Sequence, residues 1–124
     1  GGRILPAAPE ARFAALRLQA LADGITDAAI LIVYENRFRK EGERSAAWIE
    51  HQSGKIDRTL AHLEANPPAD DAPVTVGTIA LACAVGYLDL RFAGRWRETH
   101  PRLVAWLDGF TARVPSVETT RFKG

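Results

Sequence analysis

The sequence of 124 residues contains no methionine and a single cysteine, Cys83. One cysteine excludes an intrachain disulfide and fits a reducing compartment. An excess of charge of one sign is also missing, because 16 basic residues balance 15 acidic ones for a net charge of +1. A dedicated nucleic-acid surface normally needs a clear basic excess, so we expect no nucleic-acid partner.

Long hydrophobic runs are absent as well. No stretch approaches the roughly 18 consecutive apolar residues that a membrane span requires, and the N-terminus lacks the charged-then-apolar pattern of a signal peptide. We therefore expect a cytoplasmic protein with no membrane partner. The apolar content of 47% is nevertheless enough for a real core, and the length fits one domain of ordinary size.

Groups that could bind a metal or form a catalytic centre are sparse. The only histidines are His51, His62 and His100. His51 and His62 lie about three turns, or ~16 Å, apart on one expected helix, which is too far for them to ligate a common metal. No pairing of nucleophile with base and no phosphate-binding loop stands out. We therefore expect no catalytic residue and no metal site within this chain.

What the sequence does contain is a succession of helical segments separated by glycine and proline. Pro9 suits the first position of a helix, Gly24 is expected to bend or break that helix, and Gly42 is expected to end it. A loop or distorted turn is expected at residues 93–97. The later helices are expected at residues 43–65, 75–92, 101–113 and 116–120. The prediction is an all-α, five-helix bundle that occupies residues 9–124.

The start of the expected third helix carries the most specific local pattern. Thr75 is a good N-cap, because its hydroxyl can accept a hydrogen bond from the backbone N–H of Thr78. Val74 precedes the cap and Ile79 lies five residues after Val74, which is the spacing of a hydrophobic staple. These four residues predict a helix whose first amides are satisfied without water.

The same four residues resemble the capping box and staple of the central helix in glutathione transferases, with Thr78 where that family usually has aspartate. The runs 82–91, 100–107 and 113–116 resemble bacterial members of the family. The resemblance implies the all-helical C-terminal domain of a bacterial-type cytosolic glutathione S-transferase. Residues 1–8 would then be the lead-in from a missing thioredoxin-like domain.

Residues 23–27 resemble the Asp-Gly-x-x-Asp segment of several transferase classes. In those classes the second aspartate reaches across the dimer interface to the γ-glutamyl amine of glutathione bound by the neighbouring subunit. The resemblance implies this role for Asp27, through a charge-assisted hydrogen bond. The alternative is that Asp27 only favours the first turn of a helix that resumes after Gly24.

The resemblance also implies that Val33, Tyr34 and Arg37 line the pocket for the hydrophobic co-substrate. The alternative for these residues is packing in the core and at an interface, where tyrosine is common. The apolar run 28–34 extends nearly all round its helix, which predicts that the core covers one side and a partner the other. In the family this partner is a second subunit, so we expect a homodimer.

Together these features predict a chain that contributes the co-substrate pocket and dimer interface of a glutathione transferase. The parent protein would transfer glutathione, its co-substrate, to electrophilic compounds. The chain itself would hold no cofactor and would be inactive, because it has no domain that activates the thiolate. Two alternatives are a non-catalytic transferase-like assembly module, as found in translation factors and synthetases, and an unrelated helical ligand-binding bundle.

Overall fold

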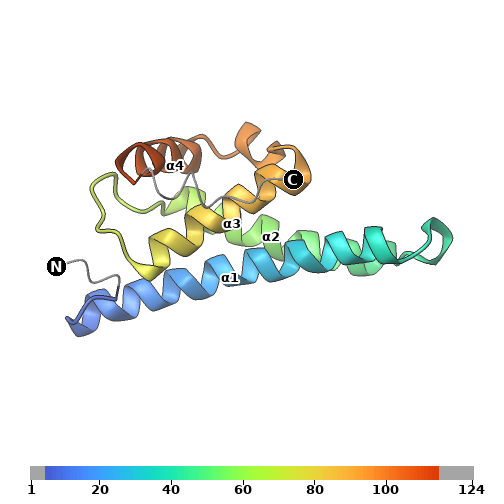
Figure 1. Ribbon diagram of the computed structural model, residues 1–124, viewed down its shortest axis with the longest axis horizontal. Helices are drawn as coiled ribbons and strands as arrows, with labels where there is room; N and C mark the ends of the chain where they lie inside the picture. Colours follow the sequence, from blue (N-terminus) through green and yellow to red (C-terminus); the bar gives the residue numbers. More distant parts are fainter. Residues whose placement is uncertain (1–4, 115–124) are drawn as a thin grey trace.

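The computed structural model describes residues 5–114, and this part of the chain is all-α. Four α-helices and two short 3-10 helices follow one another along it, and Figure 1 shows how α1 to α4 are arranged. They are α1 (Pro9–Phe38), η1 (Glu41–Glu43), α2 (Ala46–Ala65), α3 (Val76–Phe92), η2 (Arg95–Glu98) and α4 (Pro101–Arg113). The predicted all-α class is confirmed, whereas the fifth helix predicted near residues 116–120 lies outside the described residues. None of the helices within residues 5–114 is long and apolar enough to cross a membrane.

Gly24 neither bends nor breaks α1, so the expectation of an interruption there was wrong. The helix continues from Pro9 to Phe38, and a Cβ added at Gly24 would meet nothing within 4 Å. Its neighbours Ala22 and Ile25 are fully buried. Packing on both sides of Gly24 therefore outweighs the roughly 1 kcal/mol that glycine costs in a helix interior.

The connection between α1 and α2 is longer than predicted, because α1 ends before Gly42 and α2 begins after Glu43. The buried carboxylate of Glu35 explains this difference. It accepts a hydrogen bond of 2.8 Å from the backbone N–H of Ser45 and pairs with Arg39 at 2.9 Å. Ser45 is thereby fixed as the N-cap of α2, which leaves the preceding residues to form the 3-10 turn η1.

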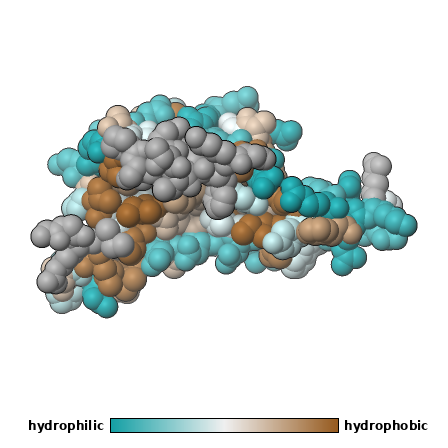
Figure 2. Space-filling model, in the orientation of Figure 1, coloured by the Kyte–Doolittle hydropathy of each residue, from teal (hydrophilic) through white to brown (hydrophobic). Residues whose placement is uncertain are grey.

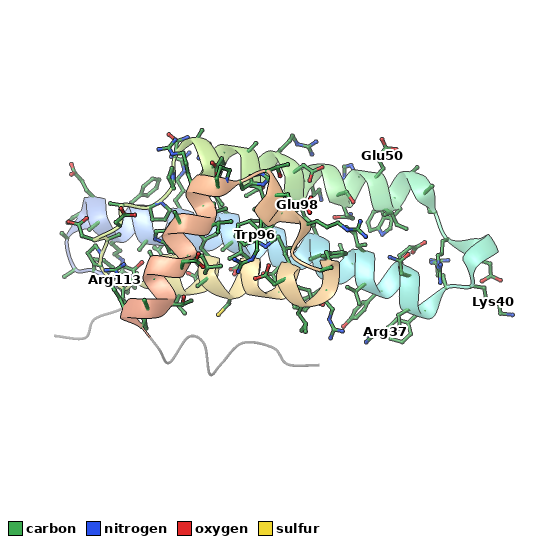
Figure 3. All side chains as sticks on the ribbon, turned by 90° about the horizontal axis from the view of Figure 1, so that it is seen from above. Arg37, Lys40, Glu50, Trp96, Glu98 and Arg113 are labelled. Carbon is green, nitrogen blue, oxygen red and sulfur yellow. The ribbon has the colours of Figure 1, made fainter. Side chains whose placement is uncertain are left out.

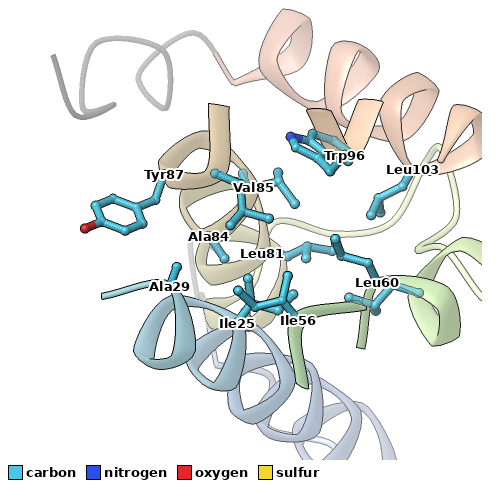
Figure 4. Packing of buried hydrophobic residues seen from close by; sticks show 14 of the residues in the cluster. Ile25, Ala29, Ile56, Leu60, Leu81, Ala84, Val85, Tyr87, Trp96 and Leu103 are labelled. Atoms are coloured by element: carbon cyan, nitrogen blue, oxygen red, sulfur yellow. The ribbon is translucent and has the colours of Figure 1, made fainter. Parts of the chain in front are cut away.

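The core lies where α3 crosses the hairpin of α1 and α2. α3 makes its most extensive contacts with α1, and the end of the hairpin projects beyond α3 and α4 (Figure 1). Buried side chains from every α-helix and from η2 meet here, including Ile25, Leu60, Val85 and Leu103, whereas Tyr87 points away from their centre (Figure 4). α3 is therefore the central helix that its apolar sequence predicts.

Gly77 lets α3 approach α1 closely. A Cβ at this position would lie 2.5 Å from the carbonyl oxygen of Ala15 and 2.9 Å from the Cβ of Leu18. Real Cβ atoms do not approach backbone oxygen so closely, so only glycine fits this crossing.

Glu64 ties the end of α2 to the start of α4. Its two carboxylate oxygens accept hydrogen bonds of 2.9 Å from the backbone N–H groups of Arg102 and Leu103. α4 has no side-chain cap from its own N-cap residue, His100, so Glu64 satisfies amides that would otherwise have no partner. Burial by itself raises the pKa of Glu64. The two hydrogen bonds and the charges of His100 and Arg102 lower this pKa by a larger amount, so the pKa falls below its usual value.

Asp89 holds η2 against the end of α3. Its Oδ1 accepts from Trp96 Nε1 at 2.8 Å and from Arg97 Nε at 2.9 Å. Its Oδ2 accepts from Arg97 Nη2 at 2.8 Å. The segment predicted as a loop or distorted turn is thus an ordered 3-10 helix, with Ala93 and Gly94 in the left-handed conformation ahead of it.

Candidate functional site

The residues predicted to start the third helix lie together at the N-terminus of α3. Thr75 Oγ1 accepts from the N–H groups of Gly77 and Thr78 at 3.2 and 3.3 Å. In return, Thr78 Oγ1 accepts from the N–H of Thr75 at 2.9 Å. A hydroxyl is therefore the acceptor here, in place of the carboxylate usual at this position of a capping box. Val74 and Ile79 are both partly buried against the core. These residues position α3 rather than bind a ligand.

The outward face of α1 carries a continuous line of residues that recur at steps of three and four. This line, called here the outer stripe, consists of Phe13, Leu16, Ala20, Gly24, Asp27, Leu31, Tyr34 and Phe38, all of which are exposed. The two phenylalanines at its ends are 69% and 72% exposed. Hydrophobic surface gathers over the N-terminal end of α1 in Figure 2, where Phe13 and Leu16 lie. Isolated apolar residues on a surface are ordinary, but an aligned row along one helix marks a surface suited to a partner.

Asp27 lies in the middle of the outer stripe and is exposed. Because Gly24 precedes it by three residues and has no side chain, the backbone around Asp27 is open on this face. A carboxylate between two apolar stretches is a poor contributor to apolar packing, but it is well placed to accept hydrogen bonds from an ammonium group. Asp27 does not begin a helix, since α1 passes through it without a break. The alternative of a first-turn aspartate is therefore wrong.

Val33, Tyr34 and Arg37 lie on one side of the C-terminal half of α1. Val33 is partly buried, whereas Tyr34 and Arg37 are exposed. The Tyr34 ring packs edge-on against Phe38, with ring centroids 5.4 Å apart. Arg37 lies near the end of the hairpin (Figure 3). The structure thus brings these residues close to the outer stripe, where Tyr34 follows Asp27 by two turns, about 10 Å along the axis.

No three histidine, cysteine, aspartate or glutamate side chains among residues 5–114 gather as metal ligands would. Two hollows in this part of the chain lie away from the outer stripe, one between α2 and η2 and one beside Pro67 and Pro68. Neither is lined by Asp27 or by the three predicted pocket residues.

Sequence reasoning missed the outer stripe as a unit, although its spacing was a readable signal. The run 28–34 looks apolar on all sides, but the structure divides it between two faces. Ala28, Ala29 and Ile32 are buried, while Leu31 and Tyr34 point outward. Continuing the spacing of Leu31 and Tyr34 back toward Phe13 would have predicted the stripe. The buried carboxylate of Glu35 carried no such signal, because its partner lies across a turn.

Comparison with known families relates this chain to glutathione transferases. Residues 46–109 match the family described as glutathione S-transferase, C-terminal domain. The GST-like protein YibF of Escherichia coli K12 is 35% identical over 120 residues, which are 94% of this chain and 59% of that protein.

Solved structures agree with this likeness. A glutathione transferase family member from Pseudomonas fluorescens Pf-5, with S-(propanoic acid)-glutathione bound, is 39% identical with a TM-score of 0.91. The match covers 100% of this chain and 63% of that one. A glutathione S-transferase from Methylobacterium radiotolerans, in complex with glutathione sulfonate, is 34% identical with a TM-score of 0.82 and is covered over 59% of its length. The chain therefore spans about three fifths of these relatives.

Proposed function

Because this chain belongs to the glutathione S-transferase C-terminal domain family, we propose that it is the helical part of a glutathione transferase. In this proposal a thioredoxin-like domain, preceding residues 9–124, binds glutathione and activates its thiolate. The helical part supplies the dimer interface and one wall of the pocket for an electrophilic apolar co-substrate. The parent protein transfers glutathione to that compound in the cytoplasm.

The lengths of the relatives support this assignment of the two roles to two domains. The chain covers 63% of the Pseudomonas relative that carries S-(propanoic acid)-glutathione and 61% of the same relative with glutathione bound. The remainder of such a protein is long enough for a further domain. The activation of the thiol is the task assigned to that domain.

One observation carries the proposal, namely the position of Asp27 within the outer stripe. A two-fold dimer places the same face of both subunits in contact, so a carboxylate at the middle of a self-associating stripe lies close to the partner. From there Asp27 accepts hydrogen bonds from the γ-glutamyl ammonium group of glutathione bound by the partner subunit. Val33, Tyr34 and Arg37, about two to three turns further along α1, border the co-substrate.

The test is a chimera that joins the N-terminal part of the Pseudomonas relative to this chain. We expect it to transfer glutathione to a chlorodinitrobenzene-type acceptor, whereas the 124-residue chain alone gives no turnover above a buffer blank. Asp27→Ala should raise the KM for glutathione about tenfold or more, because it removes a charge-assisted hydrogen bond. Asp23→Ala, a change at an exposed aspartate one turn earlier, should leave this KM unchanged.

Two results would contradict the proposal. A folded, dimeric chimera without activity would remove the enzymatic role and favour an assembly module. An unchanged KM in an active Asp27→Ala chimera would remove Asp27 from the glutathione site, and with it the observation that carries the proposal. Arg37→Ala supplies the matching test of the co-substrate pocket, because Arg37 lies outside the outer stripe, and it should alter KM for the acceptor and not for glutathione.

A further inference from the structure

The hollow between α2 and η2 is separate from the outer stripe and has a volume of about 250 Å³. Small-molecule sites usually enclose roughly 300–1,000 Å³, so this hollow suits a ligand smaller than a typical drug. We call it the η2 pocket. Its apolar lining comes from four elements and comprises Ile32, Ile56, Leu60, Leu88, Phe92 and Trp96.

Two residues on the η2 side of the pocket, Trp96 and His100, are held in place by hydrogen bonds. Trp96 is 6% exposed, and its indole nitrogen donates to Asp89 at 2.8 Å. His100 Nδ1 lies 2.7 Å from the carbonyl oxygen of Trp96. A carbonyl oxygen can only accept, so Nδ1 donates and the ring is fixed at one end of the pocket. A preformed wall lowers the entropy cost of binding a ligand.

Two opposite charges, called here the rim charges, line the η2 pocket from different elements. Asp57 contributes a carboxylate from α2, and Arg95 contributes a guanidinium from η2. Both residues are exposed, and neither forms an ion pair within residues 5–114. Each charge is therefore available to a ligand of the opposite sign.

A ligand that satisfies all these features has an apolar body and both an ammonium and a carboxylate group. Because both charged groups are exposed, a purely apolar ligand gains nothing from them and a ligand with one charge pairs with only one, whereas a ligand with both charges forms two charge-assisted hydrogen bonds. We propose that the η2 pocket binds a free α-amino acid with a large apolar side chain. The side chain occupies the apolar floor, the ammonium pairs with Asp57, and the carboxylate pairs with Arg95. This site does not depend on the function proposed above.

The test uses the 124-residue chain and L-phenylalanine, with binding followed by calorimetry and by amide chemical shifts. Two probes each lack one charge: 3-phenylpropionate has no ammonium group and 2-phenylethylamine has no carboxylate. We expect L-phenylalanine to bind about tenfold more tightly than either probe, since each loses one charge-assisted hydrogen bond. The shifts should concentrate at the residues that line the η2 pocket.

Charge variants make the assignment of each group separable. Asp57→Asn should weaken L-phenylalanine and 2-phenylethylamine about tenfold and spare 3-phenylpropionate, whereas Arg95→Gln should weaken L-phenylalanine and 3-phenylpropionate and spare 2-phenylethylamine. Ser53→Phe, which fills the pocket from its α2 wall, should abolish binding of all three. Asp71→Asn and Arg17→Gln make the same chemical changes at exposed positions outside the pocket and should change nothing.

Three results would overturn the proposal. Equal affinity for L-phenylalanine and both probes would show that the rim charges take no part. Glutathione binding as tightly as L-phenylalanine, and with the same shifts, would show that the apolar floor does not select the ligand. Absence of saturable L-phenylalanine binding at millimolar concentration, with the fold verified by circular dichroism, would show that the pocket is not an amino-acid site.

Discussion

Thr75 and Thr78 exchange hydrogen bonds at the start of α3. The hydroxyl of Thr75 accepts from the N–H of Thr78 at 3.3 Å, and the hydroxyl of Thr78 accepts from the N–H of Thr75 at 2.9 Å. Both residues are buried, with exposed fractions of 9% and 3%. Water therefore cannot easily replace either bond, and the central helix depends on this pair for its first amides.

Thr75→Ala should lower the free energy of unfolding by about 1 kcal/mol, and by no more than about 2. Thr78→Val keeps the shape of the side chain but leaves the Thr75 N–H without an acceptor, so it should cost about 1–3 kcal/mol. Thr75→Ser and Thr78→Ser, which retain the hydroxyl groups, are the controls and should cost much less. Urea denaturation measures all four, and a neutral Thr78→Val would show that the reciprocal bond contributes nothing.

Replacement of glycine by alanine should have opposite effects on stability at two positions. Gly77→Ala should destabilise the domain by about 1–3 kcal/mol, because its Cβ would overlap the backbone of α1. Gly24→Ala should instead stabilise it by up to about 1 kcal/mol, because a helix interior with free space favours alanine. Both are measured by thermal unfolding at submicromolar concentration, so that association does not contribute. A stabilising Gly77→Ala would contradict the close crossing of α1 and α3.

The lowered pKa of Glu64 predicts how stability responds to acid. A carboxyl group whose pKa is lower in the folded state adds stability above its unfolded pKa, near the usual 4.5. That stability is lost as the pH falls through the lower folded value. The difference in free energy of unfolding between wild type and Glu64→Gln should therefore be constant from pH 7 to about 5 and shrink below it.

The control for Glu64 is Glu50→Gln, at an exposed carboxylate on the same helix. Urea denaturation across this pH range provides the comparison for both variants. If Glu50→Gln gave the same pH-dependent difference, the effect would belong to net charge and not to the link between α2 and α4.

The sequence predicted those helices whose start signals are local. Thr75 and Pro101 each mark a helix start by their own chemistry, and α3 and α4 begin and end where the pattern placed them. Two of the errors, a break at Gly24 and the start of α2 at Glu43, both concern contacts made across space. Packing of α1 against α3 decides the first, and the carboxylate of Glu35 decides the second.

The candidate sites also differ in whether the local sequence could predict them. Asp27, Val33, Tyr34 and Arg37 follow from resemblance and local spacing, and all four lie on or beside one face of α1. The η2 pocket could not be predicted, because its walls come from α1, α2, α3, η2 and the two residues after η2. Only the tertiary fold brings those segments together, and no periodicity within a single helix indicates which residues will line the pocket.

The outer stripe leads to the last prediction, which is self-association. Five large apolar or aromatic side chains of the stripe are between 38% and 72% exposed, so pairing them across a two-fold axis would remove them from water. In a test of the 124-residue chain, this face of α1 would associate without contacts from a further domain. We therefore expect a dimer of moderate strength, with a Kd of about 1 μM, or about −8 kcal/mol.

Two neighbouring residues separate the interface from the core. Leu31→Glu places a charge on the exposed stripe and should give a folded monomer, whereas Ile32→Glu places it where the side chain is only 5% exposed and should unfold the domain. Ala61→Glu adds the same charge at an exposed position on α2 and should leave both association and fold intact. Sedimentation velocity over a concentration series, with circular dichroism for the fold, measures all three. A wild-type chain that remained monomeric at tens of micromolar would exclude association through the stripe, and with it the reason to place Asp27 beside a neighbour's glutathione.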